Sequence, residues 1–128
     1  MNENEVAKNF LDTAFEIHTK FGPGLFESVY EKLLAYQLPK KGFPVERQKI
    51  LPLLYENLKI ESGFRTDLLV DDAVIAEFKS IESVLPVHKK QLLTYLRLSG
   101  RHLGLLINFN EAHLKDGITR IVNNLKTI

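Results

Sequence analysis

The feature that most constrains the fold of this chain is an almost unbroken apolar run, HLGLLINF, at residues 102–109. Apolar side chains on consecutive positions point to both faces of a strand. Such a run is therefore typical of a strand that is buried on both faces of its sheet. Helices packed on the faces of the sheet would provide that burial, which favours a mixed α/β architecture.

Helical periodicity accounts for much of the remaining sequence. Apolar residues at helical spacing predict helices at residues 4–20, 25–40, 87–99 and 114–125. The sequence Gly22-Pro23-Gly24 separates the first two helices, because no helix tolerates that combination well. Gly42 and Gly100 are suitable C-terminal ends for the second and third helices.

Between the second and third predicted helices the pattern changes to short strand-like runs. These runs cover residues 45–55, 58–64, 65–70 and 73–80. Pro52 indicates that the first run is interrupted or lies at the edge of the sheet, because proline cannot donate a ladder hydrogen bond. The predicted order is helices, three or four strands, a helix, a strand and a helix. No linker or internal repeat interrupts residues 1–128, so we expect a single domain.

Composition excludes several classes of protein. The chain has 128 residues, 45% of them apolar, and a net charge of +1, which excludes disorder as the main state. No apolar run approaches the roughly 20 residues that a membrane span needs. The absence of cysteine excludes a disulfide scaffold, a thiol nucleophile and any cysteine-ligated metal. Residues 1–10 contain acids and no apolar core of a signal peptide, so we expect a cytoplasmic protein.

The charge is divided unevenly along the chain. Residues 1–78 carry nine Lys/Arg against thirteen Asp/Glu, whereas residues 79–128 carry eight against three. This asymmetry either places carboxylates beside a surface that attracts phosphate or is an ordinary fluctuation in a small domain.

Three ionisable residues lie inside predicted strands, where packing does not need them. They are Asp67 in RTDLLV, and Glu77 and Lys79 in AVIAEFKS. Glu77 and Lys79 are two apart and therefore share one face of their strand. Two acids and a lysine on one face could bind a divalent cation, since carboxylate oxygens are ligands that Mg²⁺ prefers. The alternative is a cross-strand ion pair on a solvated face, which contributes little to stability.

A metal site at these residues would require a particular hairpin between their strands. A two-residue loop would pair Asp67 with Ala76 and place Glu77 on the opposite face. A three-residue loop at 71–73 pairs Val70 with Val74 and brings Asp67 opposite Glu77. We therefore predict the three-residue loop, commonly built from a type I turn with a bulge, or a bulge that restores the same parity.

Further motifs follow in an order that resembles a known superfamily. Asp67, Glu77 and Lys79 resemble the D-(x)n-E-x-K core of the PD-(D/E)XK nucleases. Gln91 and Tyr95 are similar to the Q-x-x-x-Y motif of the RecB-type branch and share one helix face. Residues 24–30, GLFESVY, match the G-x-x-E-x-x-Y motif of the GxxExxY family. The stretches VERQ, PVHKKQLLTYL and GLLINFN also look like that family, from about residue 17 to 121.

The resemblance implies a three-layer restriction-endonuclease-like fold with an αβββαβ core and a Mg²⁺- or Mn²⁺-dependent phosphodiesterase site. The implied metal ligands are Asp67, Glu77, the Phe78 carbonyl and Glu27, and the implied catalytic residues are Asp67, Glu77, Lys79, Gln91 and Tyr95. Lys79 would orient or help to deprotonate the attacking water, and Gln91 and Tyr95 would contact the phosphate or steady Lys79.

Other residues are candidates for supporting roles. The candidates for binding nucleic acid are Arg65, Lys89, Lys90 and Arg97. The candidates for positioning the catalytic residues without contacting the substrate are His88 and Tyr30. For the basic residues of the helix after Pro86, a solvated helix surface explains the pattern equally well.

The functional hypothesis is a metal-dependent nuclease that hydrolyses DNA, with RNA as the second candidate substrate and no membrane partner. The first alternative is a catalytically silent protein of the same fold that binds nucleic acid or a protein partner. The second is an accessory subunit without a ligand. A homodimer or a larger partner is expected because the chain is small for gripping a duplex. The near-zero net charge weighs against nucleic-acid binding, since such domains are usually basic.

Overall fold

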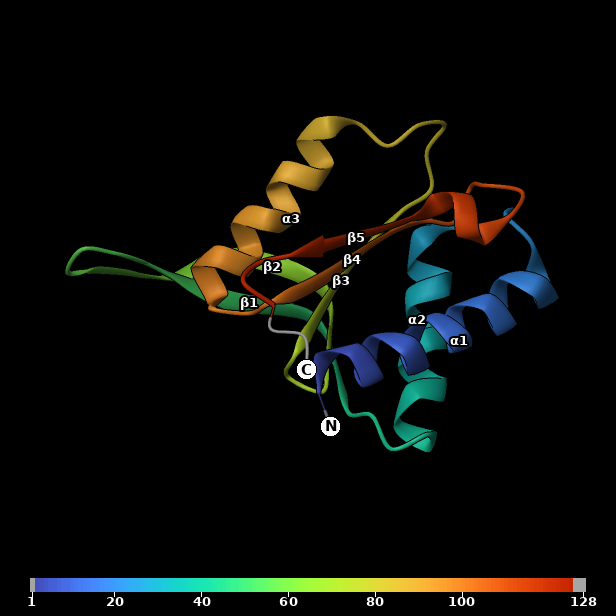
Figure 1. The fold of residues 1–128 in the computed structure, drawn as a ribbon, viewed down its shortest axis with the longest axis horizontal. Helices are drawn as coiled ribbons and strands as arrows, with labels where there is room; N and C mark the ends of the chain where they lie inside the picture. The colour runs from blue at the N-terminus through green and yellow to red at the C-terminus, as the bar shows by residue number, and fades with distance from the viewer. Residues whose placement is uncertain (1, 126–128) are drawn as a thin grey trace.

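A five-stranded mixed sheet lies at the centre of the structure, a computed structural model that describes residues 2–125 (Figure 1). The elements are α1 (Glu3–Phe21), α2 (Glu27–Lys40), β1 (Val45–Tyr55), β2 (Leu58–Val70), β3 (Val74–Lys79), α3 (Pro86–Ser99), β4 (Leu103–Asn108), the 3₁₀ helix η1 (Leu114–Gly117) and β5 (Ile118–Val122). The strand order in the sheet is β1-β2-β3-β4-β5. Among the described residues, no helix is both long and apolar enough to cross a membrane.

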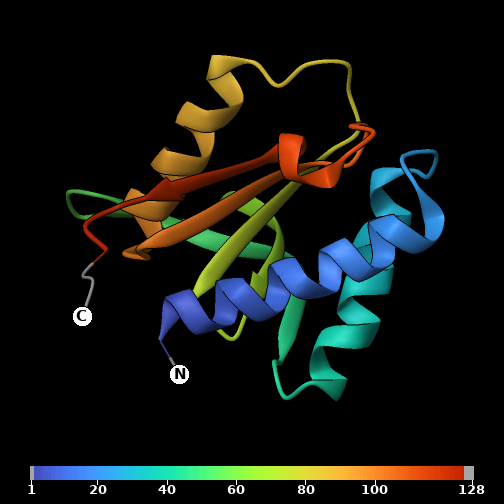
Figure 2. The same cartoon turned by 45° about the vertical axis from the view of Figure 1, so that its right-hand side comes forward.

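Helices cover both faces of the sheet, so the molecule has three layers, with the sheet between two helical layers (Figure 2). On one face, α1 and α2 pack against the sheet around Phe10, Tyr30 and Phe78. On the other face, Leu92 and Leu96 of α3 pack in a second apolar cluster. The α2-β1-β2-β3-α3-β4 order contains the αβββαβ core, so the predicted three-layer α/β fold is confirmed.

β4 is buried on both faces, as the apolar run predicted. All six of its residues are buried. β3 and β4 run parallel, with Glu77 opposite Leu106 and Lys79 opposite Asn108, and α3 forms the connection between them. The carboxyl ends of these two strands therefore lie at the same edge of the sheet, where ligands bind in open α/β sheets.

β1 and β2 form a long hairpin that extends beyond the helices (Figure 1). The two predicted runs at 58–64 and 65–70 form one continuous strand, so three strands precede α3. The register shifts between Leu51 and Leu53, on either side of Pro52. β1 is an edge strand, and the interruption expected at Pro52 is confirmed.

The predicted helix at residues 114–125 is wrong. The structure has η1 at Leu114–Gly117 and then β5 at Ile118–Val122. β5 pairs antiparallel with β4, and it thereby satisfies the backbone groups at the second edge of that buried strand. Its β-branched residues favour a strand. Gly117 lies so close to the Asn108 carbonyl that a Cβ atom there would clash. The turn into β5 therefore requires glycine at this position.

The turn between β2 and β3 has the predicted length. Val70 pairs with Val74 and Leu68 with Ala76, so the loop at 71–73 has three residues. The turn is not of the expected type I, in which both central residues have negative φ. Asp71 and Asp72 instead have positive φ, at 51° and 54°. A turn of this mirror-image kind matches the twist of the two strands. Aspartate tolerates that conformation better than most residues.

Candidate active site

The site forms where β2 separates from β3. Leu68 and Ala76 are the last paired residues of this ladder, and Asp67 and Glu77 come next on either strand. The N–H of Asp67 donates to Oε2 of Glu77 at 3.0 Å, and the N–H of Phe78 donates to Oδ2 of Asp67 at 2.9 Å. Side-chain carboxylates thus accept from main-chain donors at the point where the ladder ends. The two acids are fixed by the backbone of the opposite strand.

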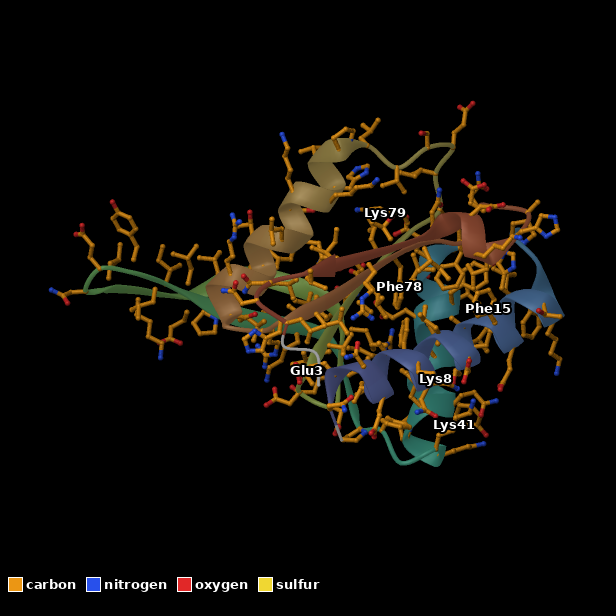
Figure 3. All side chains as sticks on the ribbon, viewed as in Figure 1. Glu3, Lys8, Phe15, Lys41, Phe78 and Lys79 are labelled. Carbon is orange, nitrogen blue, oxygen red and sulfur yellow. The ribbon has the colours of Figure 1, made fainter. Side chains whose placement is uncertain are left out.

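The α3 side of this opening is a small pocket of about 190 Å³. It is lined by Arg65, Asp67, Glu77, Lys79, His88, Gln91, Tyr95 and Leu106. Figure 3 shows Lys79 on the α3 side of the sheet and Phe78 on the side of α1 and α2. This alternation is expected of neighbouring residues in a strand. The structure therefore brings the D…E-x-K and Q-x-x-x-Y residues into one pocket.

The α2 side of the same opening is a second pocket, of about 240 Å³. It is lined by Glu27, Ser28, Glu31, Gln48, Arg65, Asp67 and Phe78. Arg65 and Asp67 line both pockets, so the opening is accessible from two sides of β2. Glu27 is exposed at the start of α2, and its Oε1 accepts from the N–H of Ser80 at 3.0 Å.

Glu77 is the most strongly perturbed acid of the site. Burial raises its pKa to about 9, and the hydrogen bond with the Asp67 side chain and the Asp67 charge act in the same direction. The Asp67 N–H and the positive charge of Lys79 oppose this rise without cancelling it. In the metal-free protein Glu77 therefore retains a proton at neutral pH.

Tyr95 links the site to the β1–β2 hairpin. Its ring stacks on Phe64, with 4.5 Å between the ring centroids and 21° between the planes. Burial raises the pKa of Tyr95, and the charges of Glu77 and Asp67 raise it further. The phenol therefore stays protonated and can donate a hydrogen bond into the pocket.

The structure gives the other predicted residues different positions. His88 lines the pocket, and its Nδ1 accepts from the N–H of Leu85 at the start of α3, at 3.0 Å. Tyr30 is buried away from the acid pair, where its hydroxyl donates to the Gly22 carbonyl and accepts from the N–H of Leu25. The three basic residues of α3 are exposed and line neither pocket: Lys89, Lys90 and Arg97.

Sequence reasoning missed a polar group on the α2 side. Glu31 is buried, and its carboxylate accepts from Arg47 Nε at 3.0 Å and from Gln48 Nε2. Gln48 has a positive φ of 50°, and its side chain reaches Glu31 of α2. The available signal was Glu31 one helical turn after Glu27, opposite the VERQ segment.

The donor set fits a magnesium-like cation. Asp67 of β2 and Glu77 of β3 offer carboxylate oxygens, and the main-chain carbonyl of Phe78, the residue after Glu77, offers a third oxygen. Within residues 2–125 no group of three or more Asp, Glu or His side chains could hold a metal ion, so Glu27 does not complete a three-carboxylate set. Mg²⁺ commonly takes only one or two protein carboxylates and completes its shell with water and phosphate.

A mixed sheet between two helical layers, with two acids and a lysine on adjoining strands, defines a protein of the restriction-endonuclease-like class. A family model described as PD-(D/E)XK nuclease superfamily matches residues 4–121, and the chain belongs to that superfamily. The searches of curated proteins and of solved structures found no match. Members of this superfamily generally use divalent metal ions and act on nucleic acid, which supports a metal-dependent nuclease.

Proposed function

We propose that this protein is a metal-dependent nuclease that hydrolyses phosphodiester bonds in DNA. The observation that carries the proposal is the pocket on the α3 side, which gathers Asp67, Glu77 and Lys79 with Gln91 and Tyr95. These residues come from three elements, β2, β3 and α3. A structural ion pair would not need Gln91 and Tyr95 beside it, whereas a phosphate would need donors on that side.

In this proposal Asp67 and Glu77 hold a Mg²⁺ or Mn²⁺ ion together with the Phe78 carbonyl. When bound, the ion lowers the pKa of a water molecule and neutralises charge on the phosphate oxygens. Lys79 orients the attacking water and offsets phosphate charge. Gln91 and Tyr95 donate hydrogen bonds to the phosphate or steady the Lys79 amine. Arg65, at the mouth of both pockets, binds a neighbouring phosphate.

The remaining residues have supporting roles. Glu27 contributes negative charge on the α2 side of the metal, and His88 supports the start of α3. Tyr30 holds the segment that precedes Glu27. The exposed side chains of Lys89, Lys90 and Arg97 bind the nucleic-acid backbone beyond the pocket. In this proposal residues 1–128 act as a single domain, and the resemblance of residues 24–30 to the G-x-x-E-x-x-Y motif supports a relation to the GxxExxY family. A homodimer or a larger partner extends the grip on the substrate in the cytoplasm.

Hydrolysis is tested by incubating the protein with labelled single-stranded, duplex and branched DNA, and with RNA, in Mg²⁺ or Mn²⁺. We expect cleavage of DNA that stops on addition of EDTA. Asp67→Asn and Glu77→Gln should each abolish it. Asp12→Asn is the matched control, because Asp12 is an exposed acid of α1 that pairs with Lys8 outside the site.

Metal binding is tested separately by calorimetry. Because both ligands must be ionised, binding should release the proton of Glu77, and the apparent affinity should rise with pH up to about 9. Calorimetry in two buffers of different ionisation enthalpy measures the released proton. Binding of metal and DNA without cleavage would instead support the catalytically silent alternative. Absence of metal binding would contradict the assignment of Asp67 and Glu77 as metal ligands.

A further inference from the structure

A further pocket lies next to the proposed active site. It has a volume of about 650 Å³ and is lined by Pro23, Gly24, Leu25, Phe26, Glu27, Ser28, Ser80 and Asn110. Glu27 and Ser28 also line the pocket that contains Asp67, so the two spaces are adjacent. The hydrogen bond from the Ser80 N–H to Glu27 joins the walls at the end of β3.

Phe26 is the unusual residue of this wall. Its side chain is 81% exposed, which is the highest value among the large apolar residues that the structure describes. Phe26 is also the N-cap of α2 and makes no side-chain capping bond. Serine, threonine, aspartate or asparagine would stabilise that position by about 1 kcal/mol. Folding therefore does not explain this residue: its ring has little packing, and the helix lacks a cap.

The segment that carries Phe26 is braced. The buried Tyr30 ring stacks on Phe109 with 4.0 Å between centroids. Its hydroxyl bonds to main-chain groups of Gly22 and Leu25, on the segment before Phe26. The carbonyl of Phe26 accepts from the N–H of Val29 at 3.0 Å. An exposed ring on a fixed backbone is a pre-organised contact surface, so binding costs less conformational entropy.

We propose that Phe26 and this pocket bind an unpaired nucleobase of the strand that is cut. The inference rests on the proposed nuclease function and adds a substrate class, single-stranded nucleic acid or an unpaired end. Every base has a π-face that can stack on an aromatic ring, whereas the bases of a duplex are already stacked on each other. The polar groups of Ser28, Ser80 and Asn110 provide hydrogen-bond partners for the edge of the base.

The charge of the two neighbouring spaces separates base from phosphate. The lining of the Phe26 pocket includes one acid, Glu27, and no lysine or arginine, so it does not favour a phosphate. Arg65 and Lys79 lie instead around the acid pair. A strand can thus place a phosphate at the acid pair and an adjacent base on Phe26.

The chain contains no tryptophan, which makes a direct test simple. Phe26→Trp introduces a single tryptophan whose fluorescence is quenched when a base stacks on it. The variant is titrated with short oligodeoxythymidine, oligouridine, an abasic strand of the same length and a duplex. Tyr36→Trp is the matched control, because Tyr36 lies on the same helix, is 62% exposed and lines none of the pockets described above.

We expect quenching of Phe26→Trp by the two single strands, little by the abasic strand or the duplex, and none in Tyr36→Trp. The DNA and RNA arms show which sugar is preferred. Affinity for oligodeoxythymidine should fall about tenfold in Phe26→Ala and Phe26→Leu, and should be retained in Phe26→Tyr, because only an aromatic ring stacks.

Several results would overturn the inference. Three of them are the absence of quenching, equal quenching by the abasic strand, and equal quenching of the control variant. A fourth is tryptophan emission that shifts with protein concentration alone, which would make the pocket an interface between copies of this chain. Cleavage without quenching would reject the base site and leave the nuclease proposal standing. Quenching without cleavage would reject the nuclease proposal and retain the base site.

Discussion

The main-chain N–H of Asp67 donates a hydrogen bond to Oε2 of Glu77, with 3.0 Å between the two atoms. The N–H of Phe78 makes the equivalent bond to the Asp67 carboxylate. Each acid therefore occupies a position where a ladder carbonyl would normally accept. The orientation of the acid pair is thus fixed by the main chain of the two strands.

Stability of the metal-free protein should decrease with pH because of Glu77. The pKa of Glu77 is about 9 in the folded protein against an ordinary value of 4.5. Between these values the folded state keeps a proton that the unfolded state has lost, so the free energy of unfolding falls as pH rises. The slope for one proton approaches about 1.4 kcal/mol per pH unit. Urea denaturation in EDTA at several pH values measures it.

Glu77→Gln should remove most of this slope, because the amide is neutral at every pH in the range. Asp12→Asn should keep the wild-type slope, since Asp12 lies outside the site. A wild-type protein whose stability is constant across the range would contradict the assigned pKa of Glu77.

Tyr95 should contribute to catalysis and to stability through different atoms. Tyr95→Phe removes the hydroxyl and keeps the stack on Phe64, so we expect little change in stability and about a tenfold lower kcat, the effect of one lost hydrogen bond. Tyr95→Ala also loses the stack, which contributes about 0.5–1.5 kcal/mol. Urea denaturation and steady-state kinetics separate the two effects. Equal kcat in wild type and Tyr95→Phe would remove the hydroxyl from the mechanism.

Gly104 should control how closely α3 approaches the sheet. A Cβ atom at Gly104 would lie 2.9 Å from the Leu92 side chain, so Gly104→Ala must displace that side chain or α3 with it. We expect a loss of about 1–3 kcal/mol in unfolding free energy, together with lower activity because Gln91 moves with Leu92. Gly24→Ala is the control for stability, because nothing lies within 4 Å of its Cβ position. Identical melting temperatures for the two variants would refute this packing argument.

Tyr30 should stabilise the segment before α2 through its hydroxyl. Tyr30→Phe keeps the ring on Phe109 but leaves the Gly22 carbonyl and the Leu25 N–H without that partner. We expect a loss of about 1–3 kcal/mol and faster hydrogen exchange in this segment. Tyr36→Phe, on the exposed side of the same helix, should change stability by less than about 0.5 kcal/mol. Unchanged exchange in Tyr30→Phe would show that the segment is held by other contacts.

The acid pair could be predicted from the sequence because strand parity is a local rule. Asp67 and Glu77 share a side only if the loop after Val70 has odd length, and the loop at 71–73 has three residues. The positions of Gln91 and Tyr95 follow the same logic, since residues four apart share a helix face. Short-range geometry explains the shared faces, but the three-residue loop is predicted only because the metal-site hypothesis requires it.

Other features depend on partners that are distant in sequence. Apolar residues at 118, 121, 122 and 125 have helical spacing, but pairing with the open edge of β4 decides for the strand. The Glu31 carboxylate meets Arg47 and Gln48 through the packing of α2 against β1, sixteen and seventeen residues later in the chain. Neither the contact of α2 with β1 nor the free edge of β4 is encoded in a short segment.

The short separation of the two acids also bears on the order of folding. Asp67 and Glu77 are only ten residues apart, and the entropic cost of closing a loop grows with its length. Hairpins form in about 1–10 μs, so the acids meet early, while Gln91 and Tyr95 arrive through the α3 crossover to β4. The acid pair is therefore expected to form before Gln91 and Tyr95 reach it.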